Sequence, residues 1–189
     1  MIPVMYNKII LLDEINKGKR FEYLFFWGHQ PQKDGSMGLS CFSQWFEAPF
    51  EVEGTTYKTT EHWMMAAKAL LFKDRESFDK IISAESPKEV KALGRMIENF
   101  DSSLWQKESF DIVVQGNYYK FSQNQEMKNY LISTEKKVLV EASPLDKIWG
   151  IGLAADHENA AKPQLWKGEN LLGFALMKVR DQLKMEESK

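Results

Sequence analysis

Strand-like stretches are few and short in this chain, whereas most of the remainder has apolar residues at helical spacing. Residues 21–27 are aromatic and strand-like, and residues 50–57 alternate apolar and polar side chains around a Gly turn, as in a hairpin. Residues 137–142 have the composition of one more buried strand. We therefore expect an α+β fold that is predominantly helical, with a small antiparallel sheet formed by the first two of these segments.

Five helices are expected in the rest of the chain. The clearest start is at residues 86–89, where Ser occupies the N-cap, Pro the first helical position and Glu the third. A second helix is expected from Thr60, as its cap, to about Phe72. The other three are expected over residues 102–121, 125–132 and 170–184.

Length and charge limit the classes of protein to which the chain can belong. Its 189 residues fit one compact domain, because domains commonly contain about 150 residues. A net charge of −2 provides no basic surface for holding a nucleic-acid backbone. No apolar run approaches the roughly 20 residues of a membrane span, and residues 1–13 lack a signal-peptide pattern. We expect a cytoplasmic protein without a membrane partner.

Neither a metal nor a disulfide is expected. The single cysteine, Cys41, excludes an internal disulfide framework and a zinc site built from several cysteines. The three histidines, His29, His62 and His157, are too scattered in sequence to indicate a metal site. We therefore predict no metal and no cofactor.

The first stretch that can carry chemistry is residues 59–68. Glu61 falls in the first helical turn, where the helix dipole favours a negative charge, and Lys68 follows two turns later near the same face. This pair can flank one ligand. The alternative is that Glu61 only stabilises the helix start and that Lys68 is solvated. His62 points elsewhere and is interpreted as a structural, hydrogen-bonded histidine.

The second stretch is residues 138–152. Glu141 lies in an apolar strand, so its carboxyl group needs a partner or a function. Asp146 follows in a loop, Trp149 can stack on a flat base, and Gly150 allows the backbone to approach a ligand. The alternative is a tight turn in which the aspartate caps the turn and the tryptophan fills the core.

Two weaker signals concern phosphate. Residues 166–173 form a Gly-containing loop before a helix, whose unpaired N–H groups attract oxyanions, and Asn170 can either cap this helix or bind a ligand. Arg95 can grip phosphate in a bidentate manner, although an arginine on a helix surface is more often only solvated.

In order and spacing these motifs together resemble the NADAR family, which includes YbiA-like N-glycosidases. The resemblance covers roughly residues 21–183 and rests on the ordered set of motifs. These motifs are Thr60-Glu61-His62-Trp63 with Lys68, Leu93-Gly94-Arg95, Trp105, Lys120-Phe121, Leu139-Val140-Glu141-Ala142, Asp146 with Trp149-Gly150-Ile151-Gly152, and Asn170-Leu171-Leu172-Gly173 with Leu176-Met177 and Arg180.

The resemblance implies a single YbiA-like domain over residues 21–185, preceded by an extension (1–20) and followed by a short tail (186–189). It also implies an enzyme that hydrolyses N-glycosidic bonds. Two substrate classes follow from it: a phosphoribosylamino-pyrimidine of riboflavin synthesis, or ADP-ribosylated guanine, free or in nucleic acid. A longer loop at residues 29–36 departs from the compact YbiA-like form and can reshape the substrate pocket.

The resemblance places Glu61, Trp105 and Asp146 at the acidic and aromatic positions of the family's active site. Its motifs also include Glu141, Lys68, Trp149, Gly150, Arg95 and Asn170. Our hypothesis is that Glu61 stabilises the developing sugar cation or activates water, while Asp146 or Glu141 has the opposite protonation role. Lys68 can bind phosphate, protonate the leaving group or attack an opened sugar. The alternatives are a non-catalytic reader of ADP-ribose or NAD-related nucleotides, and an interaction domain whose tryptophans all lie in the core.

Overall fold

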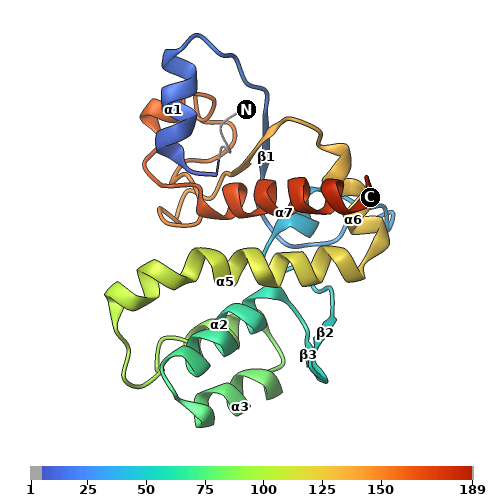
Figure 1. Cartoon of the computed structure of the whole chain (residues 1–189), viewed down its shortest axis with the longest axis vertical. Coiled ribbons are helices and arrows are strands. Elements are labelled where there is room, and N and C mark those ends of the chain that lie inside the picture. Colours follow the sequence, from blue (N-terminus) through green and yellow to red (C-terminus); the bar gives the residue numbers. More distant parts are fainter. Residues whose placement is uncertain (1–5, 189) are drawn as a thin grey trace.

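The computed structural model describes residues 6–188, which form a single α+β domain with a predominance of helix (Figure 1). The helices are α1 (Lys8–Asn16), α2 (Thr60–Leu71), α3 (Arg75–Ser83), α4 (Pro87–Leu93), α5 (Ser102–Gln123), α6 (Gln125–Ser133) and α7 (Leu171–Glu187), with short 3-10 turns η1 (Leu39–Phe42) and η2 (Pro163–Leu165). The strands are β1 (Tyr23–Phe26), β2 (Phe50–Val52), β3 (Thr55–Tyr57) and β4 (Val138–Glu141).

The strands form two separate pairs. Strands β2 and β3 make the expected antiparallel hairpin, whose turn residues Glu53 and Gly54 both have positive φ. The aromatic segment does not join this hairpin, contrary to our expectation: β1 pairs in parallel with β4, with Phe26 opposite Glu141. The physical reason is that β4 is fully buried over 138–140 and therefore needs a partner inside the core, as parallel strands do.

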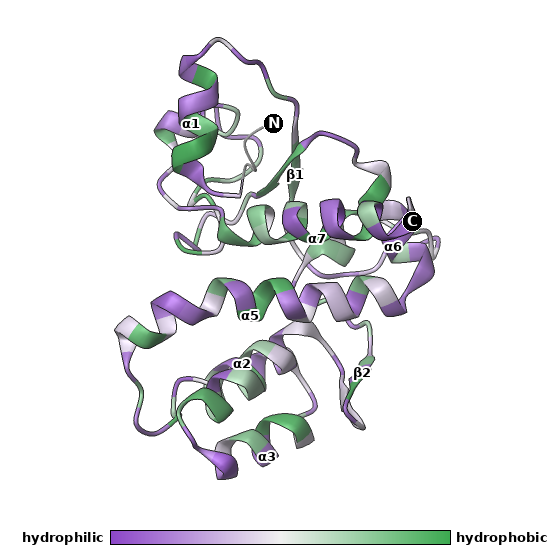
Figure 2. Cartoon of the chain, in the orientation of Figure 1, coloured by the Kyte–Doolittle hydropathy of each residue, from purple (hydrophilic) through white to green (hydrophobic). Residues whose placement is uncertain are grey.

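Helix α5 forms the centre of the molecule. In Figure 1 it runs between α7 on one side and α2 on the other, and it packs against both. Because α5 has two packed sides, its apolar residues do not gather in one stripe, and Figure 2 shows hydrophobic and hydrophilic positions mixed along its length. Even Lys120 of α5 is fully buried, and its ammonium donates hydrogen bonds to the carbonyls of Cys41 (2.7 Å) and Ser43 (2.9 Å).

The helix starts follow the sequence signals closely, with one correction. Ser86 caps α4 and Pro87 is its first residue, as predicted. The cap of α2 is Thr59 rather than Thr60, because the Thr59 hydroxyl accepts the His62 N–H. Thr60 is instead the first helical residue, and its hydroxyl donates to the Gln44 carbonyl. Helix α3 was not predicted. It begins after Asp74, whose side chain caps the helix by accepting the Ser77 N–H.

Helix α1, also missed, lies within the stretch that we assigned to an N-terminal extension, residues 1–20, of which the first five lie outside the described residues. It packs against the η2 region: Leu11 is fully buried, and the Lys8 ammonium donates to the carbonyls of Trp166 and Gly168. Within residues 6–188, no helix has both the length and the apolar character needed to cross a membrane.

Candidate functional site

The structure brings together three carboxyl groups that come from three different segments. Glu61 lies in the first turn of α2, Glu141 ends β4, and Asp146 lies in the loop after β4. The charge of Asp146 raises the pKa of both glutamates, and the charge of Glu61 also raises the pKa of Glu141. We refer to Glu61, Glu141 and Asp146 as the carboxylate cluster.

Glu61 is almost completely buried, with 6% of its surface exposed. Its backbone N–H donates to the Gln44 carbonyl (3.0 Å), which fixes the helix start against the segment after η1. Burial raises the pKa of Glu61 to about 7, and the nearby Asp146 adds to this rise, while Lys91 and a hydrogen bond from Trp45 oppose it. Near neutral pH this carboxyl group therefore exchanges a proton readily.

Glu141 occupies the last position of β4. Its Oε2 atom is buried and has no hydrogen-bond partner among the described residues. Burial is the main reason that the pKa of Glu141 rises to about 8, with Asp146 and Glu61 adding to the rise and Lys91 opposing it. We expected that a carboxyl group in this apolar strand needs a partner or a function. One oxygen of Glu141 has no partner among the described residues, and its pKa of about 8 keeps the carboxyl group protonated at neutral pH.

Asp146 is held rigidly by its own loop. Its Oδ1 atom accepts the N–H groups of Ile148 and Trp149, both at 2.8 Å, and its own N–H donates to the Ser143 hydroxyl (3.2 Å). Asp146 therefore caps a turn, as one interpretation of this stretch predicted, and its charge also affects both glutamates, while its role in catalysis stays a prediction. Trp149 is half-buried and packs against the core.

Gly150 and Asn170 hold this loop against the sheet. A Cβ atom on Gly150 would lie 2.9 Å from the Glu141 carbonyl oxygen, so only glycine permits the close approach. Asn170, fully buried in the left-handed conformation, accepts the Glu141 N–H at Oδ1 and donates from Nδ2 to the Leu139 carbonyl, both at 2.9 Å. Both residues position the end of β4, and contact of either with a substrate stays a prediction.

The start of α7 does not offer the free N–H groups that the sequence suggested. The N–H groups of residues 169–172 donate to the carbonyls of residues 147, 150, 148 and 149, respectively. The side chain of Asn170 makes no capping hydrogen bond to the helix. The expectation of an oxyanion site at this helix start is therefore wrong, because the loop that carries Asp146 already occupies it.

Lys68 and Trp105 form a second cluster, separate from the carboxylates. The Lys68 ammonium donates to the Gly94 carbonyl (2.7 Å) and lies 4.3 Å from the ring centroid of Phe100 and 5.4 Å from that of Trp105. Burial lowers the pKa of Lys68. Seven residues of helix separate it from Glu61, about 10 Å along the axis of α2.

Lys91 and Trp45 lie near Glu61 although no sequence motif indicated either of them. Lys91, on α4, is the cation whose charge opposes the pKa rise of both glutamates, and its ammonium lies 5.7 Å from the centroid of the Trp45 ring. Trp45 also lies 5.5 Å from the ring of His29. The packing of α4 against α2 brings Lys91 towards Glu61. Trp45 comes there by a different route, because the carbonyl of its neighbour Gln44 accepts the Glu61 N–H.

Of the remaining residues that the sequence singled out, His62 is buried in a hydrogen-bond network and Arg95 lies on the surface. His62 is structural, as interpreted: its Nδ1 pairs with the Thr59 hydroxyl (2.9 Å) and its Nε2 with the Ala84 carbonyl (3.3 Å). Arg95 is exposed. Among residues 6–188, no group of three histidine, cysteine, aspartate or glutamate side chains is placed to hold a metal ion.

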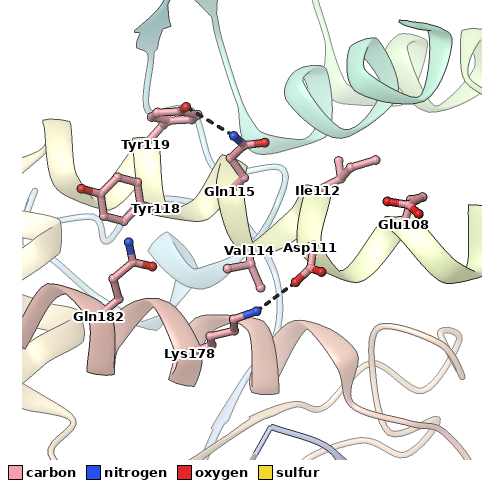
Figure 3. Close-up of a pocket in the computed structure, with 9 residues that line it drawn as sticks. All are labelled: Glu108, Asp111, Ile112, Val114, Gln115, Tyr118, Tyr119, Lys178 and Gln182. Atoms are coloured by element: carbon pink, nitrogen blue, oxygen red, sulfur yellow. Dashed lines mark hydrogen bonds and ion pairs between the residues drawn. The ribbon is translucent and has the colours of Figure 1, made fainter. Parts of the chain in front are cut away.

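Two cavities are relevant to ligand binding. One of about 220 Å³ has walls that include Trp45, Pro87 and His29 of the 29–36 loop, and none of the three residues of the carboxylate cluster lines it. The other, of about 590 Å³, lies between α5 and α7, where Lys178 and Asp111 pair across it at 2.9 Å (Figure 3). None of the predicted site residues is among the residues that line either cavity. We place the functional site at the carboxylate cluster because the fold brings three of the predicted residues together there.

Comparisons with known proteins agree on one family. The model of the NADAR domain matches residues 25–184. An N-glycosidase of Acanthamoeba polyphaga mimivirus is 43% identical over 166 residues, which cover 85% of this chain and 96% of that protein. The N-glycosidase YbiA of Escherichia coli strain K12 is 31% identical over 149 residues, 79% of this chain and 82% of that protein. The NMR structure of E. coli YbiA superposes with a TM-score of 0.71 at 26% identity, covering 90% of both chains.

Proposed function

This chain belongs to the NADAR family, and from that premise we propose that it is an N-glycosidase that hydrolyses a ribosyl C1–N bond at the carboxylate cluster. The observation that carries the proposal is the convergence of Glu61, which is buried, with Glu141 and Asp146, which are partly exposed, and two of the three carboxyl groups are able to hold a proton near neutral pH. Perturbed carboxyl groups of this kind are typical of acid–base sites.

The chemistry requires two things of the site. Cleavage of a ribosyl C1–N bond passes through a state with positive charge on the sugar, and the departing nitrogen needs a proton or a comparable electrophile. A carboxylate stabilises the positive charge on the sugar, and a carboxylic acid supplies the proton to the departing nitrogen. Both forms coexist here, because three carboxyl groups that share one region cannot all ionise without strong mutual repulsion.

In the mechanism that we propose, Glu141 is the proton donor. Its pKa of about 8 keeps it protonated at neutral pH, and its buried Oε2 has no partner to compete for the proton. Glu61, with a pKa of about 7, accepts a proton from the attacking water. Asp146, fixed by two backbone N–H groups, faces the developing positive charge of the sugar.

Lys68 and Trp105 of the second cluster, together with Trp149 and Arg95, supply substrate contacts in this proposal. Trp105 or Trp149 stacks on the base that leaves. Lys68 binds phosphate or helps the leaving group, and its lowered pKa also suits a nucleophilic amine. Arg95, exposed and without a described partner, is available for a phosphate oxygen. The two candidate substrates are a phosphoribosylamino-pyrimidine and an ADP-ribosylated guanine.

A product assay tests the proposal. The purified protein is incubated with each candidate substrate, and released ribose 5-phosphate or ADP-ribose is quantified by mass spectrometry. We expect release by the parent protein and a loss of at least about 100-fold in the Glu61→Gln variant. Glu108→Gln, a carboxyl group outside the cluster, is the matched control and should retain full activity.

A non-catalytic nucleotide reader is the competing account. It predicts that nucleotide raises the melting temperature equally in the parent protein and in the Glu61→Gln variant, with no product from either. An interaction domain whose tryptophans are all structural predicts no such rise. Trp63 and Trp166 fit that structural role, since their indole N–H groups donate to backbone carbonyls, whereas the indole of Trp45 bonds to Glu61.

A further inference from the structure

Helix α1 precedes residues 25–184, which the model of the NADAR domain matches, and it docks on the segment that leads into α7. Figure 1 shows α1 beside the orange part of the chain, where it packs against η2, and its Leu11 is fully buried there. The Lys8 ammonium donates to the carbonyls of Trp166 and Gly168, both at 3.1 Å. The side chain of Lys8 therefore links α1 to residues 166–168.

Residues 168–172 in turn hold the loop that carries Asp146. The N–H groups of residues 169–172 donate to the carbonyls of residues 147–150 at 3.1 or 3.2 Å. Gly168 approaches this loop so closely that a Cβ atom on it would lie 2.3 Å from the Gly150 carbonyl oxygen and 2.8 Å from the Lys147 Cα atom. Because no space separates the two segments, a displacement of residues 166–168 displaces residues 147–150 as well.

The direction of the Asp146 carboxylate depends on the same loop. Its Oδ1 atom accepts the N–H groups of Ile148 and Trp149, both at 2.8 Å. The carbonyls of these two residues accept the N–H groups of Leu171 and Leu172. A continuous path of hydrogen bonds and backbone therefore runs from Lys8 through the start of α7 to the Asp146 carboxylate.

We propose that Lys8 is a positioning residue that fixes Asp146 in the carboxylate cluster, so that α1 supports the active site from outside the matched domain. This inference rests on the proposed function for the part that Asp146 plays in catalysis. In that mechanism Asp146 faces the developing positive charge of the sugar, and such stabilisation requires a group whose direction is fixed in advance. Loss of the Lys8 contacts should therefore lower kcat more than it changes KM.

Amide hydrogen exchange followed by NMR tests the positioning step without a substrate. The variant Lys8→Met keeps the apolar part of the side chain and removes the donor. In this variant the amides of Ile148 and Trp149 should exchange about 10- to 100-fold faster than in the parent protein, the factor that corresponds to losing hydrogen bonds from a charged donor. Lys8→Arg again supplies donors for both carbonyls and should restore slow exchange.

Lys17→Met is the matched control, because Lys17 pairs with Asp13 and Glu14 within the N-terminal segment and none of its described contacts reaches residues 166–168. It should exchange as the parent protein does. Amides at the centre of α5 are the internal reference, since they report unfolding of the whole domain. Equal acceleration at α5 and at residues 148–149 in Lys8→Met, or no acceleration at either, would overturn the inference.

Turnover gives the second readout. With the candidate substrate that the parent protein cleaves, Lys8→Met should lower kcat by about 10-fold and leave KM nearly unchanged, and Lys8→Arg should recover most of the loss. An unchanged kcat in Lys8→Met would overturn the inference. If exchange is accelerated only around Asp146 but the parent protein cleaves neither substrate, the proposed function fails, while the positioning of Asp146 by Lys8 stands.

Discussion

The ionisation of Glu141 should lower the free energy of unfolding, and replacing this residue by glutamine makes the decrease measurable. The carboxyl group titrates near 4.5 in an unfolded chain and at about 8 in the fold. Between these two values the unfolded state binds fewer protons than the folded state, so stability falls as pH rises. Each unit of difference between the folded and unfolded pKa values corresponds to about 1.4 kcal/mol. The free energy of unfolding is therefore about 4 kcal/mol lower at pH 8 than at low pH.

Glutamine removes the titration but adds a buried amide. Because Oε2 of Glu141 has no partner, an amide N–H in its place is unsatisfied and costs about 1–3 kcal/mol at every pH. Glu141→Gln should therefore be more stable than the parent protein by about 1–3 kcal/mol at about pH 8. At about pH 5, where the parent protein has lost little stability, the variant should be the less stable of the two.

Urea unfolding at these two pH values measures the difference directly, since the midpoint reports stability when the slope is unchanged. Glu108→Gln, the same substitution at a position outside the carboxylate cluster, is the control for the effect of the exchange itself. A Glu141→Gln difference that is equal at both pH values would refute the reasoning, because it would mean that Glu141 titrates alike in the folded and unfolded states.

Three further predictions concern stability. Gly173→Ala should destabilise the fold by about 1–3 kcal/mol in urea unfolding, because its Cβ would lie 2.1 Å from the Leu139 carbonyl oxygen; an unchanged midpoint would contradict this close contact. Lys120→Met should remove a rise in stability between pH 7 and pH 10.5, since burial lowers the pKa of Lys120 from 10.5 to about 7 and the unfolded chain binds more protons in that range. Melting curves at both ends of the range test this, and a rise that persists in the variant would refute it. Thr59→Ala should cost about 1 kcal/mol in urea unfolding through the lost cap of α2, and an unchanged midpoint would contradict the assignment of Thr59 as this cap.

Local signals in the sequence were sufficient for most of the secondary structure. The Ser-Pro start of α4 and the Gly turn of the hairpin are short-range features, and the structure confirms both. The pairing of β1 with β4 was not predicted, because more than 100 residues separate them and only the fully buried side chains of β4 indicate a parallel partner. Helix α1 lacks a clear apolar stripe, which explains why it was missed.

The candidate site was predictable in part. Glu61, Glu141 and Asp146 were each singled out from their own stretches, and the fold brings them together. Lys91 was not, because a lysine in a charged surface helix looks solvated until the packing of α4 is known. Asn170 was singled out for a ligand, but its side chain is bonded to the backbone of β4, a contact between distant segments that no local pattern encodes.

The central claim is that the carboxylate cluster hydrolyses a ribosyl C1–N bond, and isotopically labelled water tests it most directly. The protein and its Glu61→Gln variant are incubated separately with the phosphoribosylamino-pyrimidine in water labelled at oxygen, and the products are examined by mass spectrometry. The account predicts labelled ribose 5-phosphate from the parent protein and at least about 100-fold less from the variant. Equal release of labelled ribose 5-phosphate by the parent protein and the Glu61→Gln variant would contradict it.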